Sequence, residues 1–156
     1  REAKPGMPEN RLDERLERYE KNAGRIDERL QEADCGVRLQ QRGRRADRQG
    51  YYALTALFDG EPAAQAASAA LVPALQAEGL PVKPTYGCVY DHMLYNPEPD
   101  SYRIEGDACA QKAGTKRAVC LAHERFGIEG RADLIADALI KVARHAETLK
   151  DWKPEE

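Results

Sequence analysis

Apolar residues recur along residues 11–34 at alternating intervals of four and three residues. This spacing places apolar side chains on one side of an α-helix and leaves charged side chains on the others. Gly36 follows at the position where a left-handed residue usually ends a helix. The apolar positions are Leu12, Leu16, Tyr19, Ala23, Ile26, Leu30 and Ala33. The pattern predicts one long helix whose apolar seam is buried, either in a homodimer or against the rest of the chain.

Strand-forming residues and turn residues alternate in the middle of the chain. They predict three strands, over residues 51–58, 85–90 and 101–105. The Ala-rich segment between the first two strands is expected to form a helix with Pro62 in its first turn, where the missing backbone donor costs nothing. The order strand, helix, strand then predicts a crossover between two parallel strands of one sheet.

Two further helices are expected near the C-terminus. Thr115 is a suitable N-cap for a helix that ends at Phe126, before Gly127. Residues 131–150 carry an apolar stripe, which includes Leu134, along one side of a longer helix. Together these elements predict an α+β fold, in which a small sheet of about three strands is packed with about four helices.

Length and charge limit what such a chain can be. The 156 residues suffice for one domain, and we expect a flexible lead-in over residues 1–9, a charged helix over 10–36 and a single α+β domain over 37–156. The 24 basic and 27 acidic residues give a net charge of −3, so no general basicity indicates binding to nucleic acid. The longest nearly apolar run spans about ten residues, whereas a membrane helix needs about twenty.

The four cysteines, Cys35, Cys88, Cys109 and Cys120, are even in number and include no Cys-x-x-Cys pair. Scattered cysteines of this kind favour two disulfides in an oxidising compartment. We expect bridges between Cys109 and Cys120 and between Cys35 and Cys88, in a periplasmic or secreted protein. The chain begins with Arg1, which agrees with removal of a signal peptide or an anchor, or with trimming. Four reduced, buried cysteines in the cytosol are the alternative.

Two alternative chemistries involve the same region of the sequence. Cys88 and His92, together with Cys120 and His123, could bind zinc in a zinc-stabilised intracellular interaction module. A small exported enzyme could instead use the region of Cys88, Asp91 and His92 for nucleophilic catalysis. The sequence has no glycine-rich phosphate loop and no assembled set of catalytic residues. We therefore expect a protein that is not an enzyme and that requires no metal or other cofactor.

The segment over residues 38–48 holds five arginines and one acid, the strongest local excess of charge in the chain. It lacks the interleaved aromatic residues that indicate binding to nucleic acid. We expect these arginines to pair with acids of the first helix or of the acidic loop. Arginine is also frequent at protein interfaces, so a contact surface for an acidic protein is the alternative.

A proline-rich loop over residues 91–100 follows the second predicted strand. Its side chains Asp91, His92, Met93 and Tyr95 combine charge and aromatic character with a stiff backbone, as protein-binding surfaces do. We therefore expect these four residues to contact a partner. The sequence as a whole favours an exported, non-catalytic protein that binds another protein, of the inhibitor, immunity-protein or envelope-accessory type.

Overall fold

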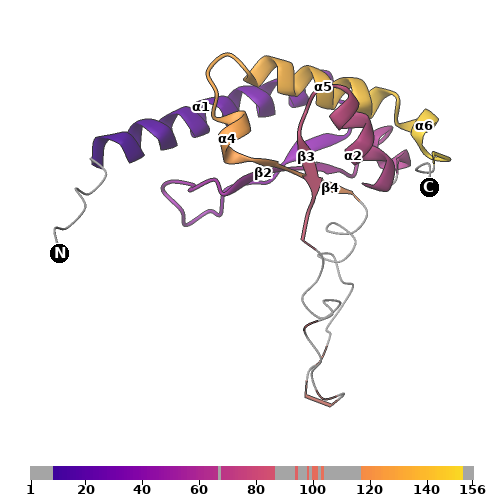
Figure 1. The fold of residues 1–156 in the computed structure, drawn as a ribbon, viewed down its shortest axis with the longest axis horizontal. Coiled ribbons are helices and arrows are strands. Elements are labelled where there is room, and N and C mark those ends of the chain that lie inside the picture. Colours follow the sequence, from indigo (N-terminus) through magenta and orange to yellow (C-terminus); the bar gives the residue numbers. More distant parts are fainter. Residues whose placement is uncertain are drawn as a thin grey trace.

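The structure is a computed structural model that describes residues 9–66, 68–86, 94, 98, 100, 101, 103 and 117–152. Its elements are α1 (Glu9–Ala33), β1 (Val37–Leu39), β2 (Ala53–Phe58), the short 3-10 helix η1 (Ala63–Gln65), α2 (Ser68–Ala77), β3 (Val82–Pro84), β4 (Ala118–Ala122), α4 (His123–Phe126), α5 (Ala132–Arg144) and α6 (Ala146–Leu149). The helices α1, α2 and α5 lie on one side of the strands, and α1 packs along α5 (Figure 1).

The four strands form one antiparallel sheet in the order β1-β2-β4-β3, which confirms the predicted α+β class. The two central strands, β2 and β4, pair so that Thr55 lies opposite Cys120. β3 pairs with the other side of β4, where Val82 lies opposite Leu121. Because β2 and β3 are both antiparallel to β4, they run in the same direction, as the predicted crossover requires. The strand β4 lies between them, however, so the two are not neighbours.

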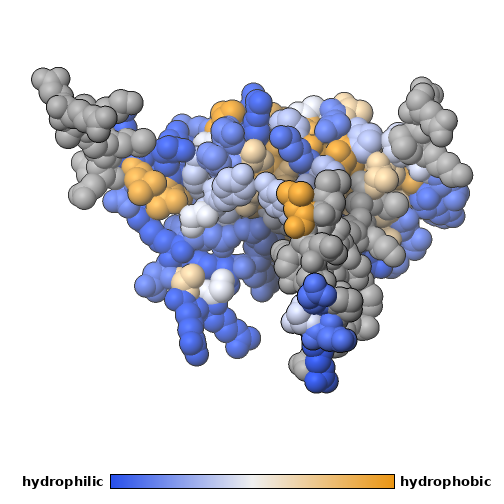
Figure 2. All heavy atoms as spheres, turned by 60° about the horizontal axis from the view of Figure 1, so that its bottom comes forward, coloured by the Kyte–Doolittle hydropathy of each residue, from blue (hydrophilic) through white to orange (hydrophobic). Residues whose placement is uncertain are grey.

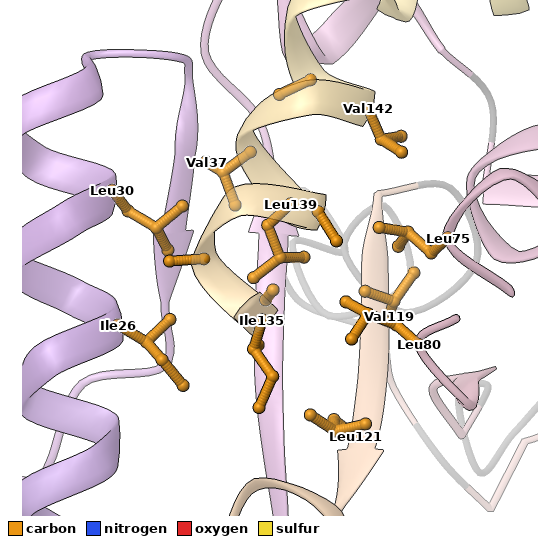
Figure 3. Close-up of a cluster of buried hydrophobic side chains, with 14 of the residues drawn as sticks. Ile26, Leu30, Val37, Leu75, Leu80, Val119, Leu121, Ile135, Leu139 and Val142 are labelled. Atoms are coloured by element: carbon orange, nitrogen blue, oxygen red, sulfur yellow. The ribbon is translucent and has the colours of Figure 1, made fainter. Parts of the chain in front are cut away.

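The hydrophobic core lies between the helices and one face of the sheet. In β2, which was expected within residues 51–58, Leu54, Ala56 and Phe58 are buried and the residues between them are half-buried. This alternation is that of a strand with one side in the core. Figure 3 shows the meeting of three elements in this core: Ile26 and Leu30 from α1, Ile135 and Leu139 from α5, and Val119 and Leu121 from β4.

The helix α1 begins two residues before the predicted start and places the middle of its apolar seam in the core. Tyr19, Ala23, Ile26 and Leu30 are buried, and α1 packs mainly against α5 and β1. Leu12, in the first turns, has 56% of its surface exposed. The middle of the seam is therefore buried against the rest of the chain. A homodimer through this helix stays a prediction.

Exposed ion pairs add to the packing of α1 on α5. The guanidinium groups of Arg25 and Arg29 lie 3.0 and 2.7 Å from Oδ1 of Asp133, and Arg29 also donates to Asp137 at 2.5 Å. The hydrogen bond from Arg29 holds the pKa of Asp133 below its ordinary value. The ion pairs therefore join α1 and α5 beside their buried contact.

The turn after α1 joins the end of that helix to the end of β2. Gly36 has a φ of 77°, as expected for a left-handed residue at a helix end. The backbone amides of Asp59 and Gly60 both donate to the Gly36 carbonyl, at 3.2 and 3.0 Å. A Cβ atom at Gly36 would lie 2.1 Å from the carbonyl oxygen of Gly60, so this approach requires glycine.

The helix predicted between Thr115 and Phe126 is wrong over most of its described length. Residues Ala118–Ala122 form the central strand β4, and helix is found only over His123–Phe126, before Gly127 as expected. Five successive small or apolar residues fit a buried strand as well as a buried helix. Pairing with β2 on one side and β3 on the other decides in favour of the strand, against the helix propensity of its alanines.

The predicted helix over residues 131–150 is present but breaks at His145, between α5 and α6. Leu134 was expected on its buried stripe, yet 65% of its surface is exposed. One residue along a helix turns a side chain by about 100°, which directs Leu134 away from the core that contains Ile135. No helix among the described residues is long and apolar enough to cross a membrane.

Two predicted strands fall largely on residues that the structure does not describe. Of the range 85–90, Thr85 and Tyr86 are described, and neither belongs to a strand. The two described residues of 101–105 do not form a strand either, and the remaining residues of both ranges lie outside the described part. The lead-in expected over 1–9 lies outside it too, except for its last residue.

Candidate functional site on the open face of the sheet

We call the side of the sheet opposite the helices the open face; it is formed by Ala53, Thr55, Lys83, Cys120 and Ala122. Strand pairing places Ala53 opposite Ala122 and Thr55 opposite Cys120 on the two central strands. The Thr55 hydroxyl and the Cys120 thiol lie 3.6 Å apart. In the described part of the chain no helix covers this face (Figure 1). Because its central side chains are small, the centre of the open face is recessed relative to its margins.

A hollow of about 550 Å³ lies over the open face. The side chains of Tyr52, Tyr86, His123 and Glu124 line it together with Lys83. The two ends of the loop between β1 and β2, and the two prolines at the ends of β3, complete the lining. Figure 2 brings the lower side of Figure 1 forward, and the coloured residues on it are mainly hydrophilic, with hydrophobic residues in small separate groups. The hollow itself has a largely apolar lining with two aromatic side chains and a few charged groups.

Tyr52 and Tyr86 are the most exposed large side chains of the hollow, with 75% and 83% of their surfaces accessible. The neighbouring phenol of Tyr86 raises the pKa of Tyr52 above its ordinary value. The backbone carbonyl of Tyr52 also lies 3.2 Å from Nδ1 of His123. Tyr52 precedes β2, Tyr86 follows β3 and His123 follows β4, so three separate segments of the chain meet here.

The chemical groups in the hollow suit recognition by contact and hydrogen bonding. Lys83 contributes a positive charge and Glu124 a negative one, and the Glu124 carboxylate lies 3.6 Å from Nδ1 of His123. The tyrosines provide aromatic area together with hydroxyl groups that donate and accept hydrogen bonds. Within the described residues, no group of three or more His, Cys, Asp or Glu side chains is arranged to hold a metal ion.

The residues that the sequence singled out for partner binding, Asp91, His92, Met93 and Tyr95, all lie outside the described residues. Their role in binding stays a prediction. Tyr86, close to them in sequence, is described, and 83% of its surface is exposed.

The cysteine pairings are also untested. Cys35 is buried at the end of α1 and Cys120 is half-buried on β4, and both are free thiols. Their expected partners, Cys88 and Cys109, lie outside the described residues, and no disulfide is found within the described part. Of the four ligands in the zinc hypothesis, Cys120 and His123 both line the hollow, while Cys88 and His92 are not described.

Two arginines of the basic segment pair with acids of the first helix, as predicted: Arg42 with Glu20, and Arg48 with both Asp13 and Glu17. Arg38 pairs instead with Asp59, just after β2. Arg44 and Arg45, at the tip of the loop between β1 and β2, are exposed and make no ion pair within the described part of the chain. Arg42 and Arg48 therefore hold the loop between β1 and β2 against α1.

Sequence reasoning missed Tyr52, because it was assigned to the buried strand over residues 51–58. The strand begins only at Ala53. Tyr51, its neighbour, is half-buried with its ring centroid 5.4 Å from that of Phe126. Successive residues of an extended chain point to opposite sides. The tyrosine doublet was therefore a signal that one of the two rings faces the solvent.

No protein-family profile matches the chain, and no curated protein matches it in sequence.

Proposed function

We propose that this chain is a non-catalytic protein that binds another protein through the open face of its sheet. The observation that supports this most directly is the exposed pair of Tyr52 and Tyr86 above a floor of small side chains. Tyrosine is enriched at protein interfaces because it adds a large contact area while losing few rotamers.

The shape of the open face supports the same proposal. An antiparallel sheet with one solvated face usually carries polar side chains there. Here the middle of the face holds Ala53, Thr55, Cys120 and Ala122, and the longer side chains stand around it. A convex element of a partner, such as a loop or a helix, fits a surface that is low in the middle.

We further propose export to the periplasm or the extracellular space, and this rests on the sequence alone. Its support is the even number of scattered cysteines. A small exported enzyme based on Cys88, Asp91 and His92, and an intracellular zinc module that adds Cys120 and His123, stay as the alternatives. Thiol counting on natively produced protein distinguishes export from the zinc module.

The test of the binding proposal uses the full chain as bait against the envelope fraction of its native host. Wild type is compared with the double variant Tyr52→Ala/Tyr86→Ala and with the control Trp152→Ala, which removes an exposed aromatic side chain elsewhere. We expect a protein that wild type and the control retain and that the tyrosine variant loses. With the isolated partner, the loss in binding free energy should be about 2 kcal/mol, or about 30-fold in Kd.

Both tyrosines are exposed, so the double variant should keep the far-ultraviolet circular dichroism of wild type. Equal retention of the same partner by wild type and by the folded double variant would show that the open face is not the binding surface.

A further inference from the structure

A groove of about 440 Å³ runs along α5, between this helix and the segment that joins α2 to β3. Its floor is apolar and is formed by Leu80, Leu121, Ile135 and Ala138. Figure 3 shows three of these side chains, Leu80, Leu121 and Ile135, at the junction of β3, β4 and α5. Pro81 is the one lining residue that the groove shares with the hollow on the open face. The groove is therefore a separate surface.

The acidic side chains of the groove have ion-pair partners, whereas two of its basic side chains have none in the described part of the chain. Its two acids are already paired, Glu78 with Lys141 at 2.8 Å and Asp137 with Arg29 at 2.5 Å. Arg125, in α4, and Arg131, just before α5, also line the groove, and both are exposed. Neither side chain makes an ion pair or a hydrogen bond within the described part of the chain. The charge left uncompensated around the groove is therefore positive.

An exposed apolar side chain lies beside these cations. Leu134 lines the groove with 65% of its surface accessible, whereas Ile135, the next residue of α5, is in the core. It follows Arg131 by three residues, so the two side chains share one side of the helix. The groove thus combines an apolar floor, an apolar side chain at its rim and two unpaired guanidinium groups.

We propose that this groove binds an acidic peptide segment of a partner protein, one in which an aliphatic side chain lies next to carboxylates. The aliphatic side chain packs on Leu134 and the apolar floor. The carboxylates accept hydrogen bonds from Arg125 and Arg131, because a guanidinium group presents two parallel donors to a carboxylate. The volume lies within the range of sites that enclose small ligands and single peptide side chains. This proposal does not depend on the function proposed for the open face.

The test measures fluorescence anisotropy of a short fluorescein-labelled peptide of alternating Glu and Leu, titrated with the full chain. We expect saturable binding, and none of a matched peptide of alternating Lys and Leu. The variant Arg125→Glu/Arg131→Glu should weaken binding at least about tenfold, because it turns two attractive charges into repulsive ones. Leu134→Asp should weaken it as well. All three positions are exposed, so these variants are expected to fold.

A matched control reverses the same number of charges elsewhere, in the variant Arg44→Glu/Arg45→Glu. It should bind the peptide as wild type does, and so should Tyr52→Ala/Tyr86→Ala, which tests the open face. If reversal at Arg44 and Arg45 weakens binding as much as reversal in the groove, binding follows total charge and the proposal is overturned. Absence of saturable binding to wild type would overturn it too.

Discussion

The side-chain amide of Asn22 donates a hydrogen bond of 2.6 Å to the backbone carbonyl of Phe126, a residue 104 positions further along the chain. The same amide also donates to the carbonyl of Ile128, at 3.1 Å. Asn22 is buried in α1, and the two carbonyls belong to the end of α4 and the turn that follows it. Helix α1 thereby holds the short helix that carries His123 to the edge of the open face.

Replacement of Asn22 by Ala should destabilise the fold. Two backbone carbonyls would lose a partner, at least one of them in the interior, and an unsatisfied buried polar group costs about 1–3 kcal/mol. The melting temperature should fall by about 2–4 °C per kcal/mol for a chain of this size. The control Gln31→Ala removes an exposed side chain of the same helix, bonded only to Asp27, and should change the melting temperature little. Equal melting temperatures of Asn22→Ala and wild type would contradict the assigned role.

Replacement of Gly36 by Ala should destabilise the chain more than replacement of Gly79 by Ala. Both glycines have positive φ, 77° and 83°, so both variants lose about 1–2 kcal/mol to backbone strain. A Cβ atom at Gly79 meets open space, whereas at Gly36 it meets the Gly60 backbone at 2.1 Å. Urea denaturation of the two variants isolates the steric contribution. Equal losses at the two sites would show that the backbones of Gly36 and Gly60 are less close than described.

The two neighbouring phenols on the open face predict that the conservative substitution Tyr86→Phe changes the pKa of Tyr52. Tyr86→Phe removes the hydroxyl group that raises the pKa of Tyr52. The pKa of Tyr52 should therefore fall toward the ordinary tyrosine value of about 10. Titration of ring carbon signals by nuclear magnetic resonance measures it. The control Tyr51→Phe removes a tyrosine whose own pKa is raised mainly by burial, and it should leave the pKa of Tyr52 unchanged.

The ion pairs between α1 and α5 predict a dependence of stability on pH. Arg29 lowers the pKa of Asp133 in the folded state. A carboxylate of this kind stabilises the fold above its unfolded pKa, and the contribution is lost as the pH falls through the folded pKa. The melting temperature of wild type should exceed that of Asp133→Asn near neutral pH and approach it below about pH 4.

The effect at Asp133 should be small, because the groups involved are exposed, and added salt should reduce it further. Glu129→Gln, an exposed acid without an ion pair in the described part, is the control and should show no such convergence with wild type. A difference between wild type and Asp133→Asn that persists unchanged at low pH would contradict the role of the carboxylate charge.

The cysteines predict the outcome of thiol counting on natively produced protein under denaturing conditions. With bridges between Cys109 and Cys120 and between Cys35 and Cys88, no alkylatable thiol should be found. Reduction should then lower the melting temperature by more than ten degrees, since a bridge that closes about twelve residues stabilises by about 3 kcal/mol and the longer one by more. Four thiols with stoichiometric zinc would favour the intracellular module. Four thiols without metal would remove the case for export.

Local patterns in the sequence were sufficient for several elements of the fold. The spacing of Tyr19, Ala23, Ile26 and Leu30 specifies one side of a helix, because residues three and four apart share a helix face whatever the rest of the chain does. The left-handed turn at Gly36 is equally local, since glycine tolerates positive φ without a steric penalty.

The central strand and the open face, by contrast, depend on contacts between distant parts of the chain. Residues Ala118–Ala122 have the propensities of a helix as much as of a strand, and their pairing with β2, about 65 residues earlier, decides. Which side of β2 becomes the core depends on α1 and α5, which pack together from opposite ends of the chain. Tyr52 lines the hollow because that packing, in the described part of the chain, leaves the other side of the sheet without a covering helix. The sequence by itself determined the helical seam and the turn at Gly36, because their causes lie within a few residues. The tertiary structure decided the strand order and which side of the sheet is exposed, because these depend on contacts between residues far apart in the chain.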